Sequence, residues 1–148
     1  MQLDNLYQEV ILDHYKNPQN KKLAVEFDAQ VHHVNPSCGD EITLNVTLDG
    51  DLIKSVTWEG VGCSISQASV SIMTDLVKGK SLTEADSISD SFMQLMQSKG
   101  ADKGDEEILE DAVALAGVSQ YPARIKCALL GWMALKDASI QAMAKKNS

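Results

Sequence analysis

The spacing of hydrophobic positions along this chain changes twice. Near the N-terminus the apolar residues are spaced as on one face of a helix: Leu3, Leu6, Tyr7, Val10 and Ile11. This pattern predicts an amphipathic helix that ends at Asn17, because the residue before Pro18 disfavours helical backbone angles. The next apolar residues are spaced by two, which predicts a strand with one apolar face: Val25, Phe27, Ala29 and Val31.

Two more segments alternate in the same way. The range 42–48 has its apolar residues at even positions, and the range 52–59 follows after Asp49-Gly50. An Asp-Gly pair between two alternating segments is typical of a tight hairpin turn. The three alternating segments therefore predict a small antiparallel sheet.

The second half of the chain has helical spacing. Ser64 and Ser81 each begin a capping-box pattern, and Gly79 ends the first of the two helices they predict. A polar loop over 98–105 separates these helices from a shorter one over 106–116. Pro122 is placed as the first residue of the last helix. The buried stripe expected on that helix comprises Ile125, Leu129, Trp132 and Leu135.

This order of elements indicates the fold class. Strands followed by a run of helices favour an α+β fold, with a small three-stranded antiparallel sheet and helices packed on one face. With 148 residues and 44% hydrophobic content, we expect one domain, residues 1–148. The net charge of −8 argues against a nucleic-acid partner, since such partners are bound by basic surfaces.

Two features of the sequence concern cellular location. The first residues contain neither a basic region nor an apolar stretch of signal-peptide length. The longest apolar stretch, from Cys127 to Leu135, is too short to span a bilayer. We therefore expect a cytoplasmic protein without a membrane partner, in a compartment where thiols stay reduced.

Cys38 is the first of three cysteines that are candidates for chemistry. It lies in the turn between the first two strands, beside Gly39 and Asp40, and none of these neighbours builds a core. Glycine permits an unusual backbone angle that would hold Cys38 and Asp40 close together. Three thiols and the Asp40 carboxylate would supply the four ligands of a tetrahedral zinc ion.

The other two cysteines have both a functional and a structural interpretation. Cys63 follows the third strand and precedes the predicted N-cap Ser64, where a helix N-terminus stabilises a thiolate, although buried cysteine is also a common small hydrophobe. Cys127 lies one turn after Arg124 and next to Lys126, but it also neighbours apolar residues. The sequence leaves Cys127 open between a ligand and a packed side chain. His14 lies on an apolar helix face and is interpreted as a packing histidine.

Four motifs in order resemble the IscU/NifU-like iron–sulfur cluster assembly family over nearly the whole chain. They are Asp13-His14-Tyr15-Lys16-Asn17-Pro18, Cys38-Gly39-Asp40, Gly60-Val61-Gly62-Cys63-Ser64-Ile65-Ser66 and Arg124-Ile125-Lys126-Cys127-Ala128. Lys126 stands where the scaffold branch of the family has a histidine. The long stretch between Cys63 and Cys127 is similar to that of the SufU branch.

The resemblance implies a zinc-dependent sulfurtransferase that acts with a SufS-type cysteine desulfurase and passes sulfur to the downstream iron–sulfur assembly machinery. It implies Zn²⁺ ligation by Cys38, Asp40, Cys63 and Cys127. It further implies that Cys38 accepts the persulfide and that Arg124 engages the desulfurase. An alternative also remains open: a scaffold that holds iron or a transient 2Fe–2S cluster on the same residues.

Overall fold

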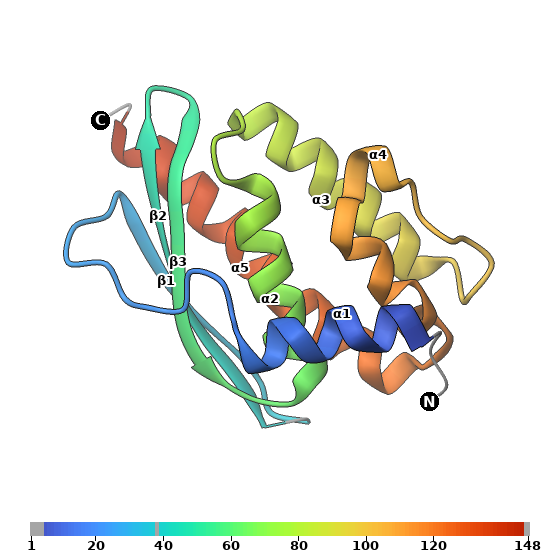
Figure 1. The fold of residues 1–148 in the computed structure, drawn as a ribbon. Coiled ribbons are helices and arrows are strands. Elements are labelled where there is room, and N and C mark those ends of the chain that lie inside the picture. The colour runs from blue at the N-terminus through green and yellow to red at the C-terminus, as the bar shows by residue number, and fades with distance from the viewer. Residues whose placement is uncertain (1–4, 38, 147–148) are drawn as a thin grey trace.

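The computed structural model describes residues 5–37 and 39–146, and the predicted order of elements is confirmed. The elements are α1 (Asn5–Lys16), β1 (Ala29–Asn35), β2 (Asp40–Asp49), β3 (Leu52–Val61), α2 (Ser64–Val77), α3 (Leu82–Gln97), α4 (Glu106–Leu109), η1 (Glu110–Gln120, a run of 3₁₀-type turns) and α5 (Pro122–Lys146). The strands form one antiparallel sheet in the order β1-β2-β3. Helices cover one face of this sheet, as the sequence predicts (Figure 1).

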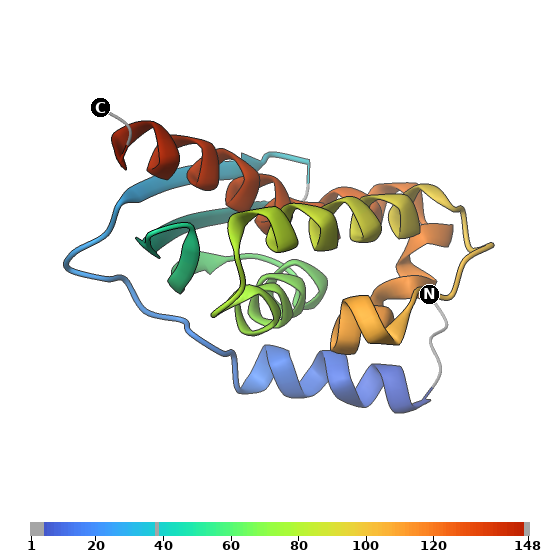
Figure 2. The ribbon, with the colours of Figure 1, turned by 90° about the horizontal axis from the view of Figure 1, so that it is seen from above.

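Alternation along β2 separates the two faces of the sheet. Ile42, Leu44 and Val46 are fully buried on the face that meets the helices, whereas Glu41 on the opposite face is exposed. In the middle layer α5 packs against β1 and β2, and α2 packs against β3. α1 lies across α2 on the far side from α5, so the molecule is layered from the sheet outward (Figure 2).

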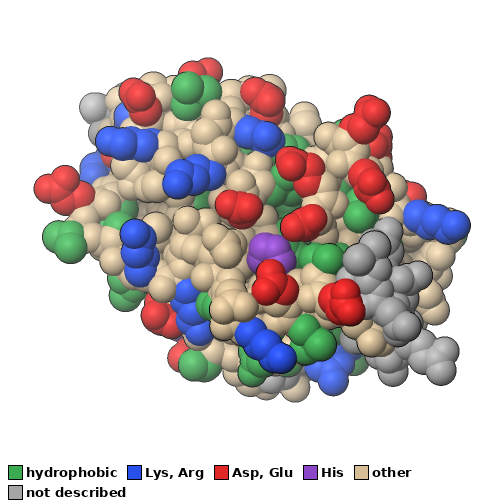
Figure 3. All heavy atoms as spheres, in the orientation of Figure 1, with side chains coloured by type: hydrophobic (Ala, Val, Ile, Leu, Met, Phe, Trp, Pro, Cys, Tyr) green, Lys and Arg blue, Asp and Glu red, His purple; other side chains and the backbone are tan. Residues whose placement is uncertain are grey.

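The surface carries charges of both signs. On the face that bears α1, acidic side chains gather around a histidine and basic side chains lie farther out (Figure 3). Among the described residues, no helix is both long enough and apolar enough to cross a membrane.

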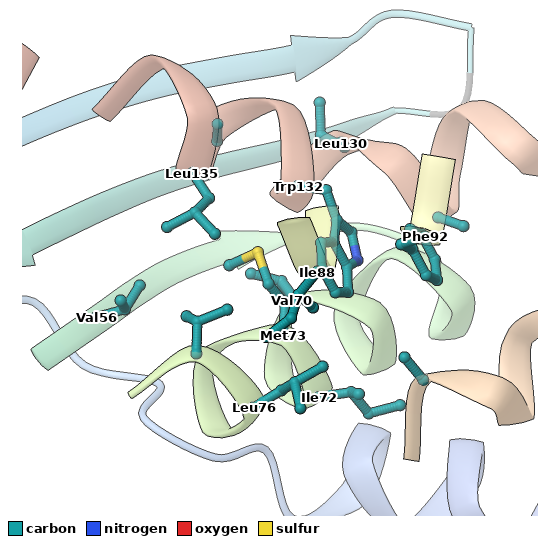
Figure 4. Close-up of a cluster of buried hydrophobic side chains, with 14 of the residues drawn as sticks. Val56, Val70, Ile72, Met73, Leu76, Ile88, Phe92, Leu130, Trp132 and Leu135 are labelled. Atoms are coloured by element: carbon teal, nitrogen blue, oxygen red, sulfur yellow. The ribbon is translucent and has the colours of Figure 1, made fainter. Parts of the chain in front are cut away.

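In the core, an aromatic stack joins α3 to α5, and a hydrogen bond joins α5 to α2. The rings of Phe92 on α3 and Trp132 on α5 are stacked with centroids 4.3 Å apart and planes 9° from parallel (Figure 4). Trp132 Nε1 also donates to Ser69 Oγ of α2 at 3.0 Å, so its one polar atom is satisfied within the core. Stacked pairs of this kind contribute about 0.5–1.5 kcal/mol beyond the area they bury.

The start of the first strand differs from the prediction. β1 begins at Ala29, and Val25 is 98% exposed. The connection from α1 is instead anchored at its two ends: Asn20 O accepts from Trp58 N of β3, and Asp28 N donates to Val46 O of β2. The alternation from Val25 to Phe27 therefore lies in a loop that reaches from one edge of the sheet to the other.

Two helix predictions also need correction. The segment 106–116 is not one helix: α4 ends after four residues, at Glu110, whose φ is +47°. On α5 the buried surface is wider than the expected stripe and shifted from it: Trp132 and Leu135 are buried as predicted, but Ile125 and Leu129 are only half-buried. Small residues are buried as well, among them Ala128, Ala134 and Ala138. Sheet, α2 and α3 all pack against α5, which explains the wider buried surface.

Candidate metal centre

Three element ends meet at one rim of the sheet. Asp40 is the first residue of β2, Cys63 lies between β3 and α2 immediately before the helix, and Cys127 lies in the second turn of α5. Their ligand atoms, one carboxylate oxygen and two sulfurs, all lie within 4.8 Å of one another. The structure thus places Cys127, which the sequence left open, beside the other two candidates.

Asp40 is almost completely buried, with 2% of its surface exposed. Its Oδ1 accepts two hydrogen bonds, from Cys63 N at 2.9 Å and from Ser66 Oγ at 3.1 Å. Its Oδ2 has no hydrogen-bond partner among the described residues. An unpaired polar atom in a dry site is costly, so a carboxylate held in this way is suited to a cation.

Cys63 is the N-cap of α2, one residue earlier than the N-cap predicted at Ser64. Its backbone is extended, with φ −72° and ψ 167°, and its Sγ accepts from Ser66 N at 3.5 Å. The sulfur therefore lies at the positive end of the α2 dipole, where negative charge is stabilised. A cysteine can replace the usual serine here because its side chain reaches the same N–H group.

Gly62 makes the close approach of these groups possible. A Cβ at this position would lie 2.3 Å from Asp40 Oδ1 and 2.6 Å from Ser66 Oγ. Any larger residue would push the carboxylate away from the start of α2. Gly62 thus contributes to the site because its missing side chain leaves room for the Asp40 carboxylate and the Ser66 hydroxyl.

Cys127 is fully buried, and its Sγ lies 3.8 Å from Ala123 O one turn earlier on α5. Arg124 and Lys126 are exposed in the same first turns of that helix. Two positive charges therefore lie on the helix that carries Cys127 into the site. They are a local exception in a chain whose net charge is −8.

Cys38, predicted as the fourth ligand and as the persulfide acceptor, lies outside the described residues. Its neighbour Gly39 adopts a φ of +66°, in agreement with the unusual backbone angle expected beside Asp40. Asn35 pairs with Asp40 across the hairpin and is buried, and its Nδ2 has no partner among the described residues.

The donor set fits a zinc ion. In a tetrahedral site, thiolate sulfurs about 2.3 Å from Zn²⁺ lie about 3.8 Å from one another. The three ligand atoms all lie within 4.8 Å of one another, which brings them near enough for one ion to be shared among them. Two thiols and a carboxylate would leave one position for Cys38.

Sequence reasoning did not single out Ser66. The residue ends the family motif that contains Cys63, but the sequence assigns it no role of its own. In the structure its hydroxyl contacts Asp40 and its main-chain N–H contacts Cys63. One signal in the sequence was available: Ser66 follows Cys63 by three residues. An N-cap side chain commonly accepts a hydrogen bond from the backbone N–H three residues later.

Comparison with known proteins agrees with the sequence motifs. The sequence profile of the NifU-like N terminal domain family matches residues 6–128. The zinc-dependent sulfurtransferase SufU of Bacillus subtilis is 51% identical over 134 residues, which cover 90% of this chain and 89% of that protein. The iron–sulfur cluster assembly scaffold protein IscU of Streptococcus pyogenes is 43% identical over 136 residues, which cover 92% of this chain and 84% of that protein.

A solved structure has the same fold over most of the chain. FiSufU from Fervidobacterium islandicum AW-1, assigned to the SUF system, has a TM-score of 0.82 and 35% identity, covering 88% of this chain and 94% of that one. The segment 6–128 that matches the family profile runs from α1 through the sheet and the next helices to the Cys127 turn of α5. By profile, sequence identity and fold, the chain belongs to the family of NifU-like N-terminal domains.

Proposed function

We propose that this chain is a zinc-dependent acceptor and carrier of persulfide sulfur for iron–sulfur cluster assembly, with a SufS-type cysteine desulfurase as its donor. The observation that supports this most directly is the convergence of Asp40, Cys63 and Cys127, whose ligand atoms lie within 4.8 Å of one another. Within the described part of the chain, Asp40 Oδ2 has no hydrogen-bond partner. The 51% identity to a protein named as a zinc-dependent sulfurtransferase points the same way.

In this proposal Cys38, Asp40, Cys63 and Cys127 hold the metal. Bound zinc keeps its thiol ligands deprotonated and adds no redox chemistry of its own. One hard carboxylate among three soft thiolates is unusual for a purely structural site, which mostly uses cysteine and histidine. The mixed ligand set therefore favours a site whose ligands can exchange.

Cys38 has the transfer role. When the donor docks, the Cys38 thiolate attacks the terminal sulfur of the donor's persulfide, and a new S–S bond forms on Cys38. The S–S bond of the donor breaks, and its cysteine leaves as a thiolate. One sulfur atom moves between two thiolates with no net oxidation, so no further electron acceptor is needed.

Arg124 is assigned to engagement of the donor. It is exposed in the first turn of α5, beside the buried Cys127. A cation on this rim of an otherwise acidic chain would attract an acidic patch on the partner and orient it toward Cys38. The acceptor that receives the sulfur next would be a component of the downstream iron–sulfur assembly machinery in the cytoplasm.

The test is a desulfurase assay with and without this protein, before and after zinc is removed with a chelator. We expect the zinc-loaded protein to accelerate sulfide release in the presence of a reductant, and the chelated protein to lose this effect. Cys38→Ala should lose it too, whereas the matched control Ser37→Ala, at the neighbouring exposed position, should keep it. Persulfide acceptance by Cys38→Ala at the wild-type rate would show that the assignment of Cys38 is wrong.

A second candidate is a scaffold for a transient 2Fe–2S cluster on the same residues. It is supported by the 43% identity to a protein named as an IscU scaffold, since thiolates and a carboxylate hold iron as well as zinc. Lys126, at the position where the scaffold branch has histidine, favours the zinc protein. Anaerobic purification distinguishes the two: a colourless protein with stoichiometric zinc supports transfer, and a brown one with iron and sulfide supports the scaffold.

A further inference from the structure

We propose that Ser66 is a positioning residue of the metal site, which holds Asp40 by one oxygen and thereby directs the other oxygen to the ion. This inference rests on the proposed function in so far as it requires a metal at Asp40. It concerns a residue of α2 that is not itself a ligand.

The hydroxyl of Ser66 has two acceptors within reach. Ser66 is 1% exposed, and its Oγ lies 3.1 Å from Asp40 Oδ1 and 3.1 Å from Cys63 O. Cys63 O already accepts the helical hydrogen bond from Gln67 N at 3.1 Å. The single hydroxyl proton is therefore best used on the Asp40 carboxylate, because a bond to a charged acceptor is stronger than a second bond to a carbonyl.

The two oxygens of Asp40 consequently differ. Oδ1 accepts from both Ser66 Oγ and Cys63 N, while Oδ2 has no partner among the described residues. Gly62 lies against Oδ1 and Ser66 Oγ so closely that a Cβ would fill the space beside both. A carboxylate fixed in this way can offer an ion one oxygen in one orientation.

Ser66 also contacts a second predicted ligand. Its main-chain N–H donates to Cys63 Sγ at 3.5 Å, so one residue touches both Asp40 and Cys63. Other buried serines of α2 bond elsewhere: Ser69 Oγ donates to Ala128 O at 2.6 Å, and Ser71 Oγ accepts from Gln19 N at 2.7 Å. Only for Ser66, among these three, do the side-chain contacts all go to residues that form the site.

The expected effect is on metal affinity. Loss of a group that orients a metal ligand typically weakens binding about 10- to 100-fold. Ser66→Ala should therefore bind zinc at least about 10-fold more weakly than the wild type. The measurement is a competition titration of apo protein with Zn²⁺ and a chromophoric chelator, which needs no sulfur-transfer activity.

Ser71→Ala is the matched control. It removes an equally buried hydroxyl from the same helix, so it reports what general loosening of α2 does to zinc affinity. We expect it to keep the wild-type affinity. Equal losses for Ser66→Ala and Ser71→Ala would overturn the proposal, as would a Ser66→Ala protein whose apo form lacks the wild-type circular dichroism spectrum, because Ser66 would then be a structural residue.

A double-mutant cycle tests whether Ser66 acts through Asp40. In an Asp40→Ala background the hydroxyl has no carboxylate to hold, so adding Ser66→Ala should cause no further loss of affinity. A further loss of the same size as in the wild type would contradict the positioning role. The two proposals fail in different ways: wild-type protein that binds no zinc contradicts the proposed function, whereas wild-type binding with unchanged Ser66→Ala affinity contradicts this inference alone.

Discussion

Two polar clusters lie on the same helix, α2, and only one of them is incomplete. At the start of the helix, Ser66 and Cys63 surround the Asp40 carboxylate, whose Oδ2 is unpaired among the described residues. Farther along, Ser71 Oγ lies 2.8 Å from His14 Nδ1 and accepts from Gln19 N at 2.7 Å. Both clusters fall in or contact motifs that resemble those of the family. The difference between them indicates two roles for buried motif residues: some complete the packing of the fold, as Ser71 and His14 do, whereas we propose that others, such as Asp40, bind a metal ion.

The second cluster is satisfied from both sides. His14 Nε2 lies 3.5 Å from Asp111 Oδ2, so both ring nitrogens of this buried histidine face a polar partner. Asn17 N and Nδ2 donate to Asp13, which closes the last turn of α1 before Pro18. The interpretation of His14 as a packing histidine is therefore confirmed, and the N-terminal motif anchors α1 on α2.

The largest effect is expected from Cys127→Ser, which removes a predicted ligand from the incomplete cluster. A serine hydroxyl is a poor substitute for a thiolate on zinc. Zinc affinity should therefore fall by more than the 10- to 100-fold typical of residues that only orient ligands. The competition titration described for Ser66 measures this loss directly.

The same variant also changes the link between zinc and stability. Zinc at 100 times its Kd should raise the wild-type free energy of unfolding by about 2.7 kcal/mol, and Cys127→Ser should lose most of this increase at the same zinc concentration. His14→Ala is the control: zinc should raise its free energy of unfolding as much as that of the wild type. If Cys127→Ser binds zinc as tightly as the wild type, Cys127 is a packed side chain and not a zinc ligand.

The contrast between the clusters also marks what a sequence can reveal. Alternation predicted the sheet because each strand has one face on the core, and Asp49-Gly50 predicted the turn between β2 and β3. The irregularity in the β2–β3 register at Thr47 and Leu48 has no counterpart in that pattern. The role of Cys127 could not be read from its neighbours, since the apolar residues around it suit a ligand and a packed thiol equally. The choice between these two roles depends on how close Cys127 lies to Asp40 and Cys63 in the folded chain. Local sequence patterns do not contain this distance.

The last helix illustrates a second limit. The predicted stripe on α5 counted only large residues, whereas Gly131 is at the contact with α2: a Cβ there would lie 2.8 Å from Val70 Cβ. Small residues at helix contacts permit close packing but leave no mark in hydrophobic spacing. Ser66 was missed for a related reason, because a serine near a helix start is usually read as a cap and seldom as a support for a ligand.

An intermediate effect, and one on stability alone, is expected when the completed cluster is broken. Ser71→Ala leaves Gln19 N and His14 Nδ1 without their shared partner, and unsatisfied buried groups cost about 1–3 kcal/mol. Urea denaturation of the apo protein should show a lower unfolding free energy by this amount. If Ser71→Ala is as stable as the wild type, water replaces the hydroxyl and the cluster is less closed than its contacts indicate.

The smallest effect is expected at a pair that belongs to neither cluster. His33 on β1 lies 2.8 Å from Asp137 on α5, through Nε2 and Oδ2, and Gln141 Nε2 donates to the other carboxylate oxygen at 2.9 Å. The hydrogen bond from His33, followed by that from Gln141, lowers the pKa of Asp137. Because the Asp137 side chain is 40% exposed, solvent screens the pair and we expect a contribution below about 1 kcal/mol.

The sign of the pH dependence follows from the lowered pKa. The unfolded chain binds a proton to Asp137 at a higher pH than the folded chain does, so this contribution is present above the unfolded pKa of about 4 and is lost as pH falls through the folded value. Asp137→Asn should thus be slightly less stable than the wild type at pH 7, with a difference that shrinks toward pH 3. Denaturation at several pH values measures it, and a difference that widens on acidification would contradict the assignment. Zinc affinity at pH 7 should be unchanged, because the pair ties β1 to α5 without touching Asp40, Cys63 or Cys127.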